Sequence, residues 1–251
     1  MINNLKILVH QGKQYIPDVT KVEIPGVFRG LPVISNENVD EKALEAICPN
    51  KAISIHPVQI DLGKCTFCGE CAFAFPNKIK FTKDYKMASN SREGLVVKQG
   101  VEIPIVLNPE SIKKEISDYF SGSLKLRQVC AGGDGSCELE LGACSNVNFD
   151  MGRFGIEFVP SPRHADGIVI TGPITKSMAE PLQICYDAMP EPKIIILAGT
   201  DAISGGIFAD SPALDRSFLE THTIDLYVPG NPIHPLTFIN GVLELIRNRK
   251  K

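Results

Sequence analysis

The second half of the chain alternates short apolar runs with helix-like segments, and this pattern constrains the fold more than any other feature. The apolar runs lie at residues 124–129, 155–159, 167–171, 193–199 and 224–229. The helix-like segments lie at residues 136–146, 175–189 and 235–248. Continuous apolar strands joined by helices are typical of a mainly parallel sheet that is covered on both faces. We therefore expect residues 125–251 to form a doubly wound α/β domain.

The first half of the chain is expected to form a separate, smaller α+β module over residues 1–95. A helix that ends at a proline and short strands around turn residues favour this interpretation. The expected helix spans residues 39–48, and the expected strands lie at 6–10, 20–24, 52–62 and 79–85. A module of this size needs a staple such as a bound metal, because its own core is small.

Residues 96–124 are expected to connect the two units. The stretch at 100–107 is interpreted as a strand, and 108–120 as a helix. Asn108 is a suitable N-cap for that helix, and Pro109 suits its first turn. The complete expectation is a flavodoxin-like, doubly wound α/β fold preceded by a small α+β module.

A cysteine-rich run at residues 63–76 reads GKCTFCGECAFAFP. Its three cysteines are two residues apart, and Phe75 and Pro76 stand where a cysteine and a proline would complete the run C-x2-C-x2-C-x3-C-P. Bacterial ferredoxins with two clusters carry that run twice, and the fourth cysteine of each run binds the other run's cluster. The missing ligand is therefore expected from another cysteine–proline pair.

Cys48 and Pro49 supply such a pair upstream of the run. Thiolates are soft ligands that suit the iron of a sulfide-bridged cube. The sequence thus predicts one 4Fe-4S cluster, with Cys48, Cys65, Cys68 and Cys71 as its ligands. A structural zinc site with four cysteine ligands uses similar paired cysteines and is the alternative, ahead of a plain core role.

Composition and charge exclude several classes of function. The net charge of −3 lacks the basic excess that is typical of nucleic-acid-binding proteins. No apolar run approaches the roughly 18 residues that a membrane-spanning helix needs. Eight cysteines without an export signal indicate a reducing compartment, so we expect a cytoplasmic protein whose membrane association comes only through partners.

Residues 126–246 resemble the small, cluster-bearing subunit shared by respiratory complex I and energy-converting NiFe hydrogenases. The segments that carry the resemblance are GSCELEL (135–141), DMGRFGIEFVPSPRHADGIVITGPIT (150–175), PEPKIIILAGTDAISGGIF (190–208) and DLYVPGNPIHP (225–235). The front module, including FRGLP at 28–32, resembles the ferredoxin-like domain that accompanies such subunits.

The resemblance implies a second cluster position at the carboxyl ends of the sheet strands. Cys137 matches one of the family's four cysteine ligands, whereas Asp134, Asp201 and Asn231 occupy the other places. Oxygen ligands suit calcium or magnesium better than iron–sulfur cubes, so we expect no 4Fe-4S cluster there. The alternatives are a hard-metal site on these residues or a cluster rewired through Cys130, Cys144 and Cys185, which otherwise behave as small apolar residues.

The loop PSPRHAD offers Arg163, His164 and Asp166 as candidate catalytic residues. An arginine–aspartate pair that fixes the loop is at least as good an interpretation, because no nucleophile and base accompany them. We therefore assign no catalytic residue.

The resemblance implies an electron-transfer subunit of a complex I-like or hydrogenase-like oxidoreductase. Its expected partners are a hydrogenase large-subunit-like protein or its complex I counterpart, together with other iron–sulfur or ferredoxin subunits, and no nucleic acid. Such a subunit is not catalytic alone and is expected at the inner face of the cell membrane through its complex. A non-redox scaffold or regulatory subunit of the same descent is the rival hypothesis, and a stand-alone enzyme lacks a supporting residue set.

Overall fold

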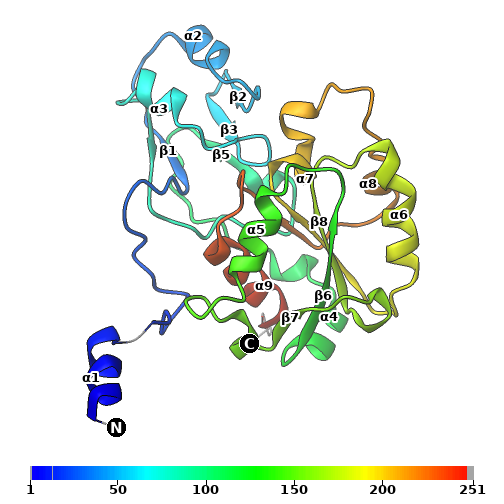
Figure 1. The fold of residues 1–251 in the computed structure, drawn as a ribbon. Helices are drawn as coiled ribbons and strands as arrows, with labels where there is room; N and C mark the ends of the chain where they lie inside the picture. The colour runs from blue at the N-terminus through cyan, green and yellow to red at the C-terminus, as the bar shows by residue number, and fades with distance from the viewer. Residues whose placement is uncertain (1, 13, 248–251) are drawn as a thin grey trace.

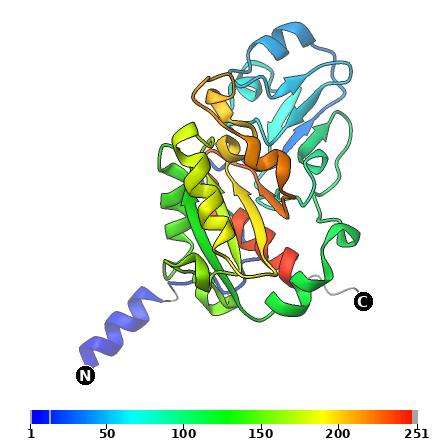
Figure 2. The same ribbon diagram turned by 90° about the vertical axis from the view of Figure 1, so that its right-hand side faces the viewer.

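The computed structural model describes residues 2–12 and 14–247 (Figure 1). A sheet-and-helix unit forms the larger body, and the N-terminal module lies over the end of that sheet where the strands finish (Figures 1 and 2). This arrangement brings loops from both units together, which matters for the candidate site.

Within the described residues, five parallel strands form the main sheet in the order β10-β9-β8-β6-β7. The strands are β6 (Leu124–Cys130), β7 (Ile156–Phe158), β8 (Gly167–Thr171), β9 (Ile194–Ala198) and β10 (Leu226–Val228). Renumbered from β6, this order is 2-1-3-4-5, which is the flavodoxin-like arrangement with a switch point between β6 and β8. The predicted doubly wound parallel sheet is confirmed.

Helices cover both faces of the sheet because its strands are apolar on both sides. On β8, Val169 belongs to one hydrophobic core, and Ile168 and Ile170 belong to the other. The first core also holds residues of α4 (Lys114–Phe120), α5 (Ser136–Ala143) and α9 (Pro235–Arg247). The second core holds residues of α6 (Lys176–Asp187), α7 (Thr200–Ser204) and α8 (Ser217–Thr221). The predicted helices at 136–146, 175–189 and 235–248 are thus found, although residue 248 lies outside the described residues.

The N-terminal module is built from short antiparallel pieces. One sheet pairs β1 (Pro32–Ile34) with β4 (Ile79–Phe81), and another has the order β2 (Ile53–Ser54), β3 (Gln59–Asp61), β5 (Val96–Lys98). Its helices are α2 (Glu41–Ala46) and α3 (Glu70–Ala74). Asp40 caps α2 by accepting a hydrogen bond from the Ala43 N–H at 3.1 Å. Because β5 pairs with β3, the start of the expected connector contributes a strand to this module.

Single-turn 3-10 segments complete the secondary structure. They are η1 (Glu93–Leu95), η2 (Pro109–Ser111), η3 (Met151–Phe154), η4 (Pro162–His164) and η5 (Gly206–Phe208). No helix among the described residues combines the length and the apolar character needed to cross a membrane.

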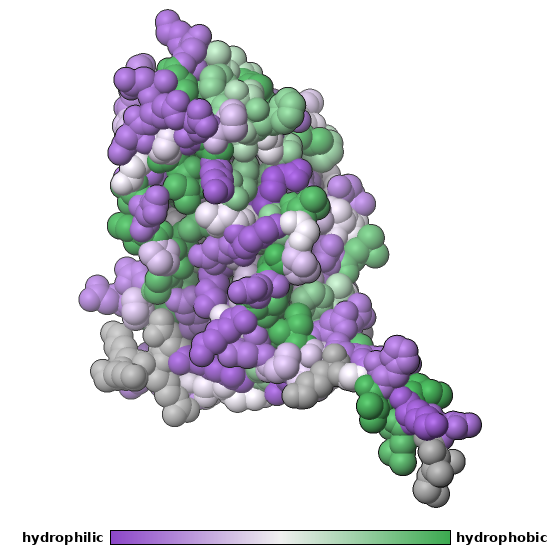
Figure 3. Space-filling view, turned by 90° about the vertical axis from the view of Figure 1, so that its left-hand side faces the viewer, coloured by the Kyte–Doolittle hydropathy of each residue, from purple (hydrophilic) through white to green (hydrophobic). Residues whose placement is uncertain are grey.

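The predicted N-terminal strand at 6–10 is wrong, because these residues lie in helix α1 (Ile2–Gln11). The helix projects from the body of the molecule (Figures 1 and 3). A strand needs a neighbour to satisfy its backbone, whereas a projecting helix makes those hydrogen bonds within itself. Leu5, Leu8 and Val9 are exposed on this helix, and they appear as a green patch in Figure 3.

The predicted strands at 20–24 and 100–107 are also wrong, because neither segment forms a ladder. The Val22 N–H donates to the Tyr85 hydroxyl at 3.0 Å instead of to a strand. The Leu107 N–H donates to Glu244 Oε1 at 3.0 Å, and Pro104 has no N–H to give to a ladder. The predicted helix at 108–120 divides into η2, where the Asn108 side chain accepts from the Glu110 N–H, and α4.

Backbone, side-chain and packing contacts join the N-terminal module to the α/β unit, and those at β10 and α7 lie close to the candidate site. Ser89 forms an antiparallel bridge with Tyr227 on β10 through backbone hydrogen bonds of 3.0 and 2.7 Å. The Thr200 hydroxyl at the start of α7 donates to the Cys65 carbonyl at 2.8 Å. A Cβ on Gly63 would lie 2.7 Å from the Ile203 side chain, so the units approach closely there.

Candidate functional site

The four predicted cluster ligands come together around one small cavity of the N-terminal module. Cys48 follows α2, Cys65 and Cys68 lie in the loop after β3, and Cys71 lies in α3. All four residues line a small cavity of about 20 Å³. Its other walls are largely apolar and include Ile53, Ile60 and Phe81. Cys48 thus lies at the same cavity as the triplet, and the ligand role of all four cysteines stays a prediction.

Two of these thiols, Cys65 and Cys71, are buried next to other cysteines. Burial raises the pKa of Cys65 to about 12 and of Cys71 to about 11, with a smaller contribution in the same direction from the neighbouring cysteines. Two backbone N–H groups also point at sulfur: Ala52 N lies 3.2 Å from Cys48 Sγ, and Phe67 N lies 3.3 Å from Cys65 Sγ. Four soft donors, apolar walls and amides directed at sulfur fit an iron–sulfur cube.

Side chains from outside the cysteine run hold the ligand loop in place. Asn50 Nδ2 donates to the Lys64 carbonyl at 3.2 Å and so ties the Cys48 segment to the triplet. Asp61, just before the loop, makes a two-pronged ion pair with Arg92, with distances of 2.7 and 2.6 Å. Its Oδ1 also accepts from the Gly63 N–H at 2.9 Å. The loop is therefore fixed at its base before any metal binds.

The position that corresponds to the second ferredoxin cluster is filled with apolar side chains. Phe75 replaces the fourth cysteine of the downstream run and is packed against the second core. Counting back from Cys48 by the same spacing places Leu44 at a former ligand position, and Leu44 is fully buried in that core. Apolar side chains, and not thiols, thus occupy these two positions.

The residues at the second family cluster position lie at the carboxyl ends of the main strands. Asp134 accepts hydrogen bonds from the Ser136 N–H and hydroxyl, at 2.9 and 2.6 Å, and so closes the turn before α5. Cys137 is buried, and a Cβ on Gly199 would lie 2.6 Å from its sulfur. Burial raises the pKa of Asp201, and the nearby Asp134 raises it further.

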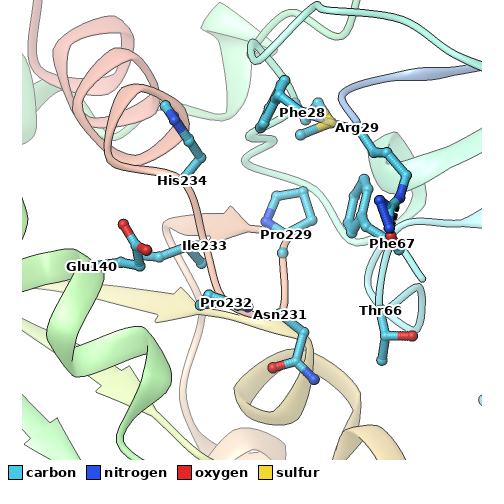
Figure 4. A pocket seen from close by; sticks show the side chains of 12 residues that line it. Phe28, Arg29, Thr66, Phe67, Glu140, Pro229, Asn231, Pro232, Ile233 and His234 are labelled. Atoms are coloured by element: carbon cyan, nitrogen blue, oxygen red, sulfur yellow. Dashed lines mark hydrogen bonds between the residues drawn. The ribbon is translucent and has the colours of Figure 1, made fainter. Parts of the chain in front are cut away.

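Asn231 is the fourth residue of this second position and lines a different hollow, between the two units. That hollow holds about 220 Å³ and is bounded by Arg29 and Phe67 from the module and by residues 229–234 (Figure 4). The Asn231 and Glu140 side chains point in different directions (Figure 4). These polar groups therefore do not converge on a common ligand atom.

His234, on the wall of this hollow, offers a pH test of the fold. Burial lowers its pKa from an ordinary value near 6.5 to about 4, and Nδ1 accepts from the Leu236 N–H at 3.2 Å. Between pH 4 and 6.5 the unfolded chain binds more protons at this residue, so stability rises with pH across that window.

We expect this residue to cost roughly 2 kcal/mol of stability on acidification from pH 6.5 to 4, after allowance for solvent screening. The check is urea unfolding of the wild type and His234→Phe across that range. The stability difference between the two proteins should change with pH, and a constant difference would contradict a neutral His234.

The remaining cysteines do not gather at the second position. Cys144 is buried in the first core and Cys185 contacts the second, so they lie on opposite faces of the sheet. Cys130 ends β6 and is exposed. Cys144 shares the apolar side of α5 with Cys137, as expected. The structure thus separates the cysteines that a rewired cluster would need.

The PSPRHAD loop lies at the amino end of β8, away from the strand ends that carry Cys137. Asp166 fixes it by accepting from the Lys125 N–H at 2.7 Å, and its carbonyl accepts from the Ile194 N–H at 3.1 Å. The expected arginine–aspartate pair is not found among the described residues, because the carboxylate of Asp166 is engaged by the backbone of β6.

Comparison with known proteins identifies the second unit. The model of the family "NADH ubiquinone oxidoreductase, 20 Kd subunit" matches residues 133–245. An NADH-quinone oxidoreductase subunit of Heliobacterium modesticaldum is 46% identical over 110 residues, which are 43% of this chain and 63% of that protein. The probable membrane-bound hydrogenase subunit mbhJ of Pyrococcus furiosus is 35% identical over 137 residues, which are 55% of this chain and 82% of that protein. The chain belongs to this 20 kDa subunit family.

A further similar protein is a formate hydrogenlyase subunit. Formate hydrogenlyase subunit 7 of Escherichia coli is 35% identical over 144 residues, 57% of this chain and 56% of that protein. The chain thus spans only part of the length of several curated relatives. A chain in the solved structure of a membrane-bound sulfane sulfur reductase, an archaeal respiratory membrane complex, is 28% identical with a TM-score of 0.45, covering 52% of this chain and 73% of that chain.

Within residues 2–12 and 14–247, no three His, Cys, Asp or Glu side chains are arranged to hold a single metal ion. Sequence reasoning did not find the roles of Asn50 and Thr200 in holding the ligand loop. Thr200 is 135 residues from its partner Cys65, and no local pattern signals such a contact.

Proposed function

We propose that the chain is an iron–sulfur electron-transfer subunit of a complex I-like or energy-converting hydrogenase-like oxidoreductase. One 4Fe-4S cluster would be held by Cys48, Cys65, Cys68 and Cys71, and would supply one-electron transfer when bound. The observation that carries the proposal is the convergence of these four thiols, from segments on both sides of β2 and β3, on one cavity.

The order of elements in the front module supports the choice of cluster over zinc. The order β1-α2-β2-β3-α3-β4 is the β-α-β-β-α-β order of ferredoxin-like units. Its outer strands β1 and β4 pair with each other, as do its inner strands β2 and β3. Cys48 follows α2 as Phe75 follows α3, so Cys48 has the place of a fourth cysteine in the upstream half, and crossed ligation requires that cysteine to complete the triplet of the other half.

The chain's own residues would position the cluster and shield it from water. The apolar walls limit the contact with solvent, which remains open at the exposed Cys68, and the N–H groups directed at sulfur stabilise negative charge. Family membership supports docking on a hydrogenase large-subunit-like protein or its complex I counterpart, with other iron–sulfur subunits as neighbours. The relatives' names include membrane-bound complexes, so we propose peripheral attachment at the inner face of the membrane through those partners.

Metal analysis of anaerobically purified full-length protein tests this proposal. We expect about four irons and four acid-labile sulfides per chain, because one cube has one complete set of thiol ligands. A zinc content near one per chain, without sulfide, would contradict the electron-transfer proposal and indicate a structural zinc site. About eight irons would show that the second position also holds a cluster.

A non-redox scaffold is the second candidate function. Of the four residues that match the family's ligands, Cys137 alone is a thiol. Asp134 caps the turn before α5, and Asp201 is buried close to Gly206. Without a cluster at this second position, an electron on the front cluster would have no nearby carrier between it and the partner subunit. A large-subunit partner that has lost its own metal-binding cysteines would favour the scaffold.

A further inference from the structure

The ligand loop of the front module is held from outside by two side chains that do not bind metal. Arg29 donates from Nε to the Phe67 carbonyl at 2.9 Å (Figure 4). Its Nη2 donates to the Cys68 carbonyl at 3.1 Å. Thr200 donates from its hydroxyl to the Cys65 carbonyl at 2.8 Å. Both residues act on carbonyl groups, and one of them belongs to the other structural unit.

The Thr200 contact is fully enclosed. Thr200 is completely buried, and its own N–H already donates to the Gly230 carbonyl at 2.8 Å. Its hydroxyl lies farther from that carbonyl, at 3.2 Å, than from Cys65. The hydroxyl therefore serves mainly the ligand loop.

Fixing these carbonyls also fixes the direction of three N–H groups. In a planar trans peptide the carbonyl of one residue and the N–H of the next point in opposite directions. The cis peptides of the described chain precede Pro57, Pro192 and Pro232, so the peptides of the ligand loop are trans. The carbonyls of Cys65, Phe67 and Cys68 are held outward by these hydrogen bonds. The N–H groups of the residues that follow them, Thr66, Cys68 and Gly69, therefore point towards the opposite side.

The side to which these groups turn is the thiol-lined cavity. Thr66, Cys68 and Gly69 all line it. In the part of the chain that the structure describes, none of their N–H groups has a hydrogen-bond acceptor. Unpartnered N–H groups beside a cavity form a positive lining that stabilises negative charge within it.

We propose that Arg29 and Thr200 are positioning residues that raise the reduction potential of the front cluster by holding three peptide dipoles towards it. Reduction adds negative charge to the cluster, so inward N–H groups favour the reduced form. The inference rests on the proposed function and adds that the α/β unit tunes a cluster bound in the other unit. Thr200 supplies that link directly through its hydroxyl.

Redox titration of the anaerobic full-length protein, followed by the signal of the reduced cluster in electron paramagnetic resonance, tests the proposal. Thr200→Val removes the hydroxyl at nearly constant volume, and Arg29→Lys keeps the charge but removes the two-pronged contact. Both variants should have a lower midpoint potential than the wild type, with iron content unchanged. Thr200→Ser keeps the hydroxyl and should restore the wild-type potential.

Thr237→Val is the matched control, because the Thr237 hydroxyl is buried but has no partner among the described residues. It should leave the potential unchanged. Wild-type potentials in both Thr200→Val and Arg29→Lys at full iron content would overturn the inference and leave the proposed function intact. Absence of iron and sulfide from the wild type would instead overturn the proposed function.

Discussion

Cys48→Ser is expected to abolish assembly of the front cluster. Iron and sulfide should fall from about four of each per chain to a small residue, and the visible absorbance of the cluster should disappear. The reason is that Cys48 lines the same cavity as the triplet, and no other cysteine lines it. A serine oxygen is a hard ligand that suits sulfide-bridged iron poorly.

Cys185→Ser is the control, because Cys185 lies on α6 and contacts the second core away from that cavity. It should keep the full iron content. If the triplet bound its metal without an upstream ligand, Cys48→Ser and Cys185→Ser would behave alike, and that result would refute crossed ligation.

Gly172→Ala is expected to destabilise the α/β unit by about 2–4 kcal/mol. Gly172 follows β8 at the switch point and has a φ of 77°. A Cβ there would collide with the backbone N of Gly133 and lie 2.8 Å from its Cα. Two causes therefore add: strain of a side chain in the left-handed region, and a clash with a backbone that cannot rotate away.

Gly142→Ala provides the matched control in the same unit. Gly142 lies in α5, and a Cβ there would meet nothing within 4 Å. Alanine favours a helix over glycine by roughly 0.5–1 kcal/mol, so this variant should be slightly more stable. Denaturant unfolding measures both changes. Equal stability of the two variants would contradict the close approach of the loops that follow β6 and β8.

The sequence predicted the main sheet well because each strand is an uninterrupted apolar run. Residues 167–171 and 193–199 are apolar on both sides, and both faces of β8 and β9 are indeed buried. Such runs indicate central strands of a parallel sheet, since a sheet covered by helices buries both faces of its strands. The crossed cysteine pattern was informative for a similar reason, because few alternatives satisfy the same spacing.

The errors lie in segments where the local signal is short. The short run at 6–10, with three apolar residues, fits a strand or a helix equally well, and the structure has a helix. The apolar stretch at 100–107 looked like a strand, but its hydrogen-bond partner is a side chain of α9. Arg29 and Thr200 reach the ligand loop across 38 and 135 residues, respectively, so their roles became visible only in three dimensions.

The central claim concerns where the iron lies. An anomalous difference map from anaerobic crystals, recorded at the iron absorption edge, locates it directly. We expect one group of iron peaks enclosed by the sulfurs of Cys48, Cys65, Cys68 and Cys71. Iron peaks beside Cys137 and Asp201, with none between Cys48 and the triplet, would contradict the account.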